Sequence, residues 1–137
     1  MEIEDYVTYE VAKLLKEKGY DEECNAYYHN DKSNEYCGVN DGERFELCEG
    51  GFYNKCNKYR DAAPTLYEAQ KWLREMYGIY VLVTPYHNSD YGKFLTFDIY
   101  RKIDCYPYLE YVNDSDDVFY FYEEALNAGI KKALEFI

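Results

Sequence analysis

Aromatic and cationic side chains gather in one short stretch of the sequence, which follows two adjacent glycines. The stretch holds three aromatic and three cationic residues: Phe52, Tyr53, Lys55, Lys58, Tyr59 and Arg60. Aromatic rings offer stacking faces, lysine and arginine meet phosphate, and glycine permits close approach of the backbone. These six residues therefore predict a binding site for a small anionic aromatic ligand such as a nucleotide. The alternative is a surface hairpin with ordinary charges.

The cysteines and histidines are the next groups that could do chemistry. Four of the five cysteines lie within about thirty residues of one another, near His29: Cys24, Cys37, Cys48 and Cys56. Four thiols and an imidazole could close a zinc site, but structural zinc sites usually use Cys-x-x-Cys pairs and this chain has none. We therefore expect reduced thiols, no metal and no other cofactor.

Recognisable catalytic motifs are absent from the sequence. His29 and His87 are the only histidines, and their spacing pairs neither with a nucleophile. There is no phosphate-binding glycine loop, and the acidic run at 114–117 lacks the glycine and final glutamate of a calcium loop. We expect a non-enzymatic binding protein with no catalytic residues. The alternative is a small hydrolase that uses His29 or His87.

Tyrosine is strongly over-represented, with 19 residues in a chain of 137. One domain cannot bury that many phenols with every hydroxyl satisfied, so many must line a surface or an interface. Strand alternation places several on one side of a sheet: Tyr80, Tyr100, Tyr106, Tyr108 and Tyr120. This Tyr-rich surface either packs beneath a helix or forms a homo-oligomer or partner interface.

The net charge of −12 is concentrated in the first fifty residues, which carry fourteen acidic and five basic groups. An acidic chain repels phosphate backbones, so direct nucleic-acid binding is not expected. A second alternative function is an acidic nucleic-acid mimic that inhibits a host DNA- or RNA-binding protein. The sequence shows neither a signal peptide nor a membrane span, so we expect a cytoplasmic protein with no membrane partner.

Local patterns predict an α+β scaffold for these residues. Helices are expected over residues 8–19, 65–77 and 123–137, the second with a capping box formed by Thr65 and Glu68 and a stop at Gly78. The clearest strands are 79–83 and 94–101, and shorter ones are expected at 26–29, 36–39, 45–48, 52–53, 106–112 and 118–121. We therefore predict a single α+β domain over residues 1–137. Its antiparallel sheet has about four or five strands with three helices packed mainly on one face, and residues 30–61 are its least regular segment.

Several segments resemble a family of small phage and prophage proteins of Bacteroides-type gut bacteria, to which no activity is assigned. The resemblance rests on APTLYEAQKWLR at 63–74, FDIY at 97–100 and YEEALNAGI at 122–130, with a similar opening at 8–19. It implies a phage or prophage accessory protein that acts in the cytoplasm of an infected bacterial host. Such a protein would bind a host factor, for example as a counter-defence protein that sequesters a nucleotide-like signal or a host protein.

Overall fold

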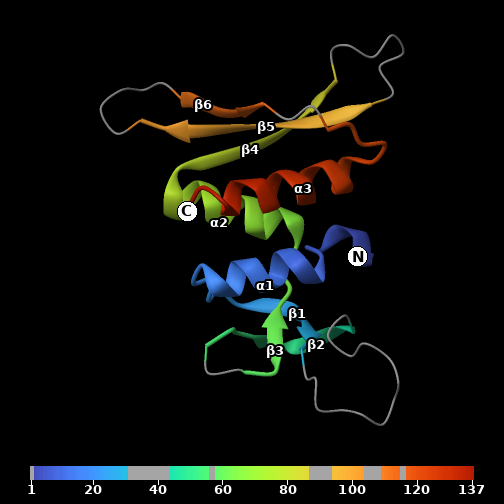
Figure 1. Ribbon diagram of the computed structural model, residues 1–137. Helices are drawn as coiled ribbons and strands as arrows, with labels where there is room; N and C mark the ends of the chain where they lie inside the picture. Colours follow the sequence, from blue (N-terminus) through green and yellow to red (C-terminus); the bar gives the residue numbers. More distant parts are fainter. Residues whose placement is uncertain (1, 31–43, 56–57, 87–93, 104–108, 115–116) are drawn as a thin grey trace. The chain divides into compact units, whose positions relative to one another are not determined.

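A computed structural model describes residues 2–30, 44–55, 58–86, 94–103, 109–114 and 117–137 (Figure 1). The chain divides into two compact units, Met1–Thr65 and Leu66–Ile137, and each has its own three-stranded antiparallel sheet. The α+β class is confirmed, with the strands divided between two sheets where the sequence predicts one sheet of four or five. Residue alternation indicates which side chains face a core, but it does not say which distant strands pair.

The first unit places one α-helix on its sheet. Its elements are a 3-10 helix η1 (Ile3–Asp5), α1 (Tyr9–Glu17), β1 (Cys24–His29), β2 (Phe45–Phe52) and β3 (Arg60–Ala62). The strand order is β2-β1-β3, so β1 is central. Gly19, with a φ of 91°, follows α1 in the left-handed conformation that the sequence predicts for a helix stop.

The core of the first unit lies between α1 and one face of this sheet. Val11, Ala12 and Leu15 are the buried residues of α1, and Ala26 and Tyr28 are buried in β1. The Tyr28 hydroxyl donates a 2.7 Å hydrogen bond to the carbonyl oxygen of Val7. Burial raises the pKa of Tyr28 to about 12, so this phenol is a neutral core group at ordinary pH.

The second unit places two helices on its sheet. Its elements are α2 (Leu66–Tyr77), β4 (Ile79–Pro85), β5 (Leu95–Lys102), β6 (Leu109–Asp114) and α3 (Tyr122–Leu134). The strand order is β4-β5-β6, and α2 and α3 pack on the same face of the sheet (Figure 1). Between α2 and β4, Gly78 has a φ of 64°, which agrees with the predicted helix stop.

Helix α3 approaches the second sheet closely at Gly129. A Cβ atom at this position would lie 2.6 Å from Cγ1 of Val81 and 3.0 Å from Cγ of Phe97. Both residues are buried on the helix-facing side of the sheet, with Ile99 beside them. The absence of a side chain at Gly129 is therefore what lets the helix backbone rest on the strands.

Three of the short predicted elements differ in the structure. The strands expected at 45–48 and 52–53 are one strand, β2, and the segment 118–121 makes only an isolated pairing of Phe119 with Leu95. Strand β3 was not among the expected elements because three residues, two of them charged, give no alternation to detect. The strand expected at 36–39 lies outside the described residues. No described helix has the length and apolar character needed to cross a membrane.

Candidate functional site

Two of the six predicted ligand-binding residues meet around Tyr27, in the centre of the first sheet. Phe52 ends β2 and its ring centroid lies 5.0 Å from that of Tyr27. Arg60 begins β3, and its guanidinium carbon lies 4.8 Å from the same ring centroid. The Tyr27 ring therefore contacts both the first and the last residue of the predicted stretch.

The face of the first sheet that lies opposite α1 carries the candidate site, and we call it the outer face. Because Ala26 and Tyr28 face the helix, the alternation of a strand places Tyr27 and His29 on the outer face. Antiparallel pairing sets Arg60 opposite His29, and Glu46 opposite Tyr27. The N–H of His29 also donates a 3.0 Å hydrogen bond to the carbonyl oxygen of Arg44.

Three basic side chains thus lie side by side on the outer face: His29 of β1, Arg60 of β3, and Arg44, the residue just before β2. We call Arg44, His29 and Arg60 the cationic row. Nη2 of Arg44 lies 3.2 Å from Nε2 and 3.4 Å from Nδ1 of His29, and Nε2 lies 2.5 Å from Oε2 of Glu46. Since one ring nitrogen cannot donate to Glu46 and accept from Arg44 with the same atom, Nδ1 is the acceptor for Arg44 in the neutral ring.

Glu46 fixes the orientation of both central rings. Its Oε2 accepts a 2.9 Å hydrogen bond from the Tyr27 hydroxyl as well as the proton of His29. The hydrogen bonds from His29 and Tyr27 hold the pKa of Glu46 below its usual value. Burial, and then the hydrogen bond to Glu46, raise the pKa of Tyr27, while the charge of Arg60 opposes that rise. At neutral pH the site therefore holds an ionised Glu46 and a neutral Tyr27.

The guanidinium groups of the row keep donors available for a ligand. In the part of the chain that the structure describes, neither Arg44 nor Arg60 forms an ion pair with a carboxylate. Arg101 of the second sheet behaves differently, since its Nη2 lies 2.6 Å from Oε2 of Glu110. A guanidinium has five N–H donors, and the guanidinium of Arg60, which lies over the Tyr27 ring, makes no hydrogen bond among the described residues, so its donors can meet an anion.

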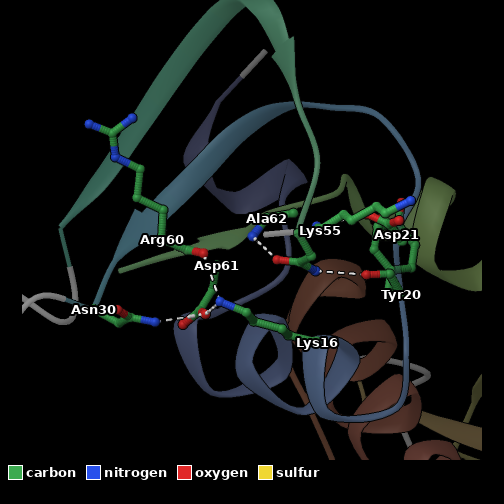
Figure 2. A network of polar contacts seen from close by, with 9 residues as sticks. Lys16, Tyr20, Asp21, Asn30, Lys55, Arg60, Asp61 and Ala62 are labelled. Atoms are coloured by element: carbon green, nitrogen blue, oxygen red, sulfur yellow. Dashed lines mark hydrogen bonds and ion pairs between the residues drawn. The ribbon is translucent and has the colours of Figure 1, made fainter. Parts of the chain in front are cut away.

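A buried polar cluster on the opposite face holds the strand from which Arg60 emerges (Figure 2). Nζ of Lys16 lies 3.1 Å from Oδ1 of Asp61 and donates a 3.0 Å hydrogen bond to the carbonyl oxygen of Arg60. Asn30 donates to the same Oδ1 at 2.9 Å, whereas the buried Oδ2 of Asp61 has no hydrogen-bond partner among the described residues. Figure 2 shows the guanidinium of Arg60 extending away from Asp61. Lys16 therefore ties α1 to both the backbone and the neighbouring side chain of β3.

The connection between β2 and β3 is fastened by a buried asparagine. Nδ2 of Asn54 donates a 2.9 Å hydrogen bond to the carbonyl oxygen of Tyr20, and its Oδ1 accepts the N–H of Ala62 at 2.8 Å. The N–H of Lys55 donates to Oδ1 of Asp21 at 2.9 Å (Figure 2). These bonds set the position of β3 relative to the end of α1, and with it the position of Arg60.

The other four predicted residues lie away from the cationic row. The Tyr53 ring is half exposed, and the charge of nearby Glu23 raises the pKa of its hydroxyl. Lys55 and Lys58 are exposed, and Nζ of Lys58 lies 5.7 Å from the ring centroid of Tyr59. No hydrogen bond, ion pair or ring contact among the described residues joins these side chains to the row.

Four members of the site were not predicted as anion-binding residues: Tyr27, His29, Arg44 and Glu46. From the sequence, His29 was considered only as a possible zinc ligand or catalytic residue. Two short alternations, of Tyr27 with His29 and of Arg44 with Glu46, indicate that each pair shares one strand face. Only the register of β1 with β2 brings the two pairs together.

The thiols and the second histidine do not join this site in the part of the chain that is described. Cys24 is buried, with its Sγ 3.6 Å from the Tyr20 hydroxyl, and Cys48 is half-buried. No three described His, Cys, Asp or Glu side chains are grouped as metal ligands. Cys37, Cys56 and His87, which the zinc and hydrolase alternatives invoke, lie outside the described residues.

Part of the predicted Tyr-rich surface lies on the face of the second sheet opposite α2 and α3. Tyr80 and Tyr100 are directly paired between β4 and β5, and the ring centroid of Tyr111 lies 5.2 Å from that of Tyr100. Strand alternation puts Tyr80 and Tyr100 on the face opposite the buried, helix-facing residues, so they do not pack beneath a helix. Tyr106 and Tyr108 lie outside the described residues, and Tyr120 precedes α3.

No protein-family model, curated protein or solved structure matches the chain. The candidate function therefore rests on the geometry of the outer face and on the chemistry of its side chains.

Proposed function

We propose that the outer face of the first sheet binds a small anionic ligand through the cationic row. The observation that carries this proposal is the alignment of Arg44, just before β2, with His29 of β1 and Arg60 of β3, with no carboxylate paired to either guanidinium among the described residues. Basic groups set side by side destabilise a sheet unless their charge is compensated. Glu46 supplies one negative charge on this face, against two guanidinium groups, and an anion would compensate the remainder.

Phosphate is the anion that the row fits best. Arginine binds phosphate oxygens with two parallel N–H donors, and such charge-assisted bonds are stronger than neutral ones. Glu46 holds the imidazole of His29 beside the guanidinium of Arg44, and the strand register places His29 opposite Arg60.

An aromatic group on the ligand would stack on the guanidinium of Arg60. The guanidinium already lies over one face of the Tyr27 ring, so the aromatic group of the ligand would stack on the side of the guanidinium that faces away from Tyr27. Planar guanidinium groups accept nucleobases on their faces as well as phosphates at their edges. A phosphate joined to an aromatic base, as in a nucleotide, therefore uses both properties of Arg60.

The resemblance to phage and prophage proteins supports a role in which binding is the whole activity. In that setting the chain would act as an accessory protein that sequesters a nucleotide-like signal of the host defence within the infected bacterium.

A thermal-shift comparison tests the proposal. AMP, a cyclic dinucleotide, pyrophosphate and inorganic phosphate are compared at constant ionic strength, with adenosine as the uncharged control. A ligand present at 100 times its Kd stabilises the folded state by about 2.7 kcal/mol, and we expect this from at least one nucleotide but not from adenosine. The proposal fails if no anion raises Tm above the value in sodium chloride of the same ionic strength.

A further inference from the structure

Exposed aromatic side chains are concentrated just before α3, in the second unit. Tyr120 is 70% exposed, Phe121 63% and Tyr122 50%, and Val118 beside them is also exposed. We call these four residues the aromatic surface. Contiguous apolar side chains left in water are uncommon on soluble proteins and often mark an interaction site.

The backbone beneath the aromatic surface is held in place. Phe119 and Leu95 exchange two backbone hydrogen bonds of 2.8 Å, which pin the segment to the start of β5. The rings of Phe94 and Tyr120 pack edge to face with centroids 5.1 Å apart. The backbone of the segment and the ring of Tyr120 are thus held in place, which lowers the entropy lost when a partner binds.

Phe121 lies at a position whose side chain normally stabilises the start of a helix. It is the N-cap of α3, where serine, threonine, aspartate or asparagine would bond a free backbone N–H, and it makes no side-chain cap bond. Its ring is nevertheless exposed, so it contributes little to the core. A residue that helps neither the helix nor the core is typical of a functional surface.

The charged residues nearest the aromatic surface along the sequence are all acidic. Between Lys102 and Lys131 the sequence has seven acidic residues and no basic one. Asp117 and Glu124 are exposed on either side of the aromatic residues, and Glu123 lies in the first turn of α3. Two copies of such a surface would repel one another, whereas a basic partner would be attracted.

We propose that the aromatic surface docks a cationic, amphipathic segment of a partner protein. Its apolar side chains would cover Tyr120 and Phe121, and its lysines or arginines would meet Asp117, Glu123 and Glu124. This site lies in the second unit and does not depend on anion binding by the first. The aromatic anchors would set the affinity, and the acidic rim would set the association rate and its salt dependence.

The test uses two synthetic helical peptides and fluorescence anisotropy. One peptide has leucines on one face and lysines on the other, and the second keeps the lysines but replaces every leucine by serine. We expect the leucine peptide to bind more tightly, and Phe121→Ser and Tyr120→Ser each to weaken it by about tenfold or more. Tyr67→Ser is the matched control, because Tyr67 lies on α2 in the same unit and is 64% exposed.

Three results would overturn the proposal. Equal binding of the two peptides would show that charge alone attracts them. Equal affinities of Phe121→Ser, Tyr120→Ser and Tyr67→Ser would show that the aromatic surface is not the site. A wild-type dimer that sedimentation detects and Phe121→Ser dissociates would identify the occupant as a second copy. Two independent serine variants are used so that a folding defect in one, detected by circular dichroism, leaves the other to decide.

Discussion

His29 and Arg60 lie directly opposite one another in the antiparallel pair of β1 and β3, with Arg44 on the other side of His29. Arg44 and Arg60 are both cationic, and like charges on neighbouring strands of one sheet face are destabilising. The arrangement is held by Glu46 on the same face and by Lys16 and Asp61 on the opposite one. The repulsion between these groups lowers the stability of the sheet, and a bound anion would relieve it. We therefore propose that the arrangement is functional.

The buried pair of Lys16 and Asp61 should be important for stability. We expect Lys16→Met to lower the free energy of unfolding by about 1–3 kcal/mol, because it leaves a buried carboxylate with Asn30 as its remaining donor among the described residues. Lys71→Met is the control, since Lys71 and Glu75 form an exposed pair at 4.0 Å whose loss should change stability by less than about 0.5 kcal/mol. Urea unfolding measures both, and equal effects would contradict the structural role of Asp61.

Tyr28 should make the protein sensitive to alkaline pH. Its folded-state pKa of about 12 lies above the ordinary value of 10.0, so the stability it contributes is present below pH 10 and is lost as pH rises from 10 towards 12. Tyr28→Phe also removes the bond to Val7, so the variant should be less stable at pH 7 by about 1 kcal/mol. The difference from wild type should shrink above pH 10. Tyr120→Phe, at an exposed position, should keep the wild-type alkaline profile. A Tyr28→Phe profile that falls as steeply as wild type would refute this assignment.

Glu46 should have the opposite pH dependence. Its folded-state pKa lies below the ordinary 4.5, so its stabilising effect is present above about pH 4.5 and is lost as pH falls through the lower, folded value. Glu46→Gln keeps an acceptor for Tyr27 but has no charge, so its stability should change less than that of wild type below pH 4.5. Guanidinium-induced unfolding between pH 3 and 7 tests this, and parallel acid profiles for the two proteins would count against the hydrogen bonds described.

Gly129 should not tolerate a side chain. Alanine normally stabilises a helix relative to glycine. Here, however, its Cβ atom would lie 2.6 Å from Val81 and 3.0 Å from Phe97. We expect Gly129→Ala to lose about 1–3 kcal/mol by overpacking, measured as a fall in the free energy of unfolding. Gly50→Ala, where no atom lies within 4 Å of the added Cβ, is the control. A gain in stability at Gly129 would mean that α3 sits further from the sheet.

The elements that could be predicted from sequence are those with local signals. The helix expected at 65–77 is α2 (Leu66–Tyr77), and the strand expected at 79–83 is the first part of β4 (Ile79–Pro85). Each is defined by its own apolar spacing and by Gly78 between them. The division of strands into two sheets carries no such signal, because it depends on pairing between distant residues.

The candidate site was only partly predictable for the same reason. Phe52 and Arg60 belong to a stretch whose composition is visible in the sequence. Arg44 and His29 are fifteen residues apart, and they meet only because β1 and β2 pair in one particular register. A shift of one residue in the strand register would turn His29 towards α1 and separate it from the other residues of the cationic row.

The central claim is that Arg44 and Arg60 together hold an anion. Isothermal titration with AMP and with pyrophosphate should be carried out on wild type, Arg44→Gln, Arg60→Gln and the double variant, each confirmed as folded by circular dichroism. Arg101→Gln is the control, since Arg101 lies in the second sheet and pairs with Glu110. We expect each single change at the row to lower the affinity by about 1.5–3 kcal/mol, the double change to remove binding, and Arg101→Gln to leave it unchanged. Wild-type affinity in the double variant, or an equal loss in Arg101→Gln, would contradict the account.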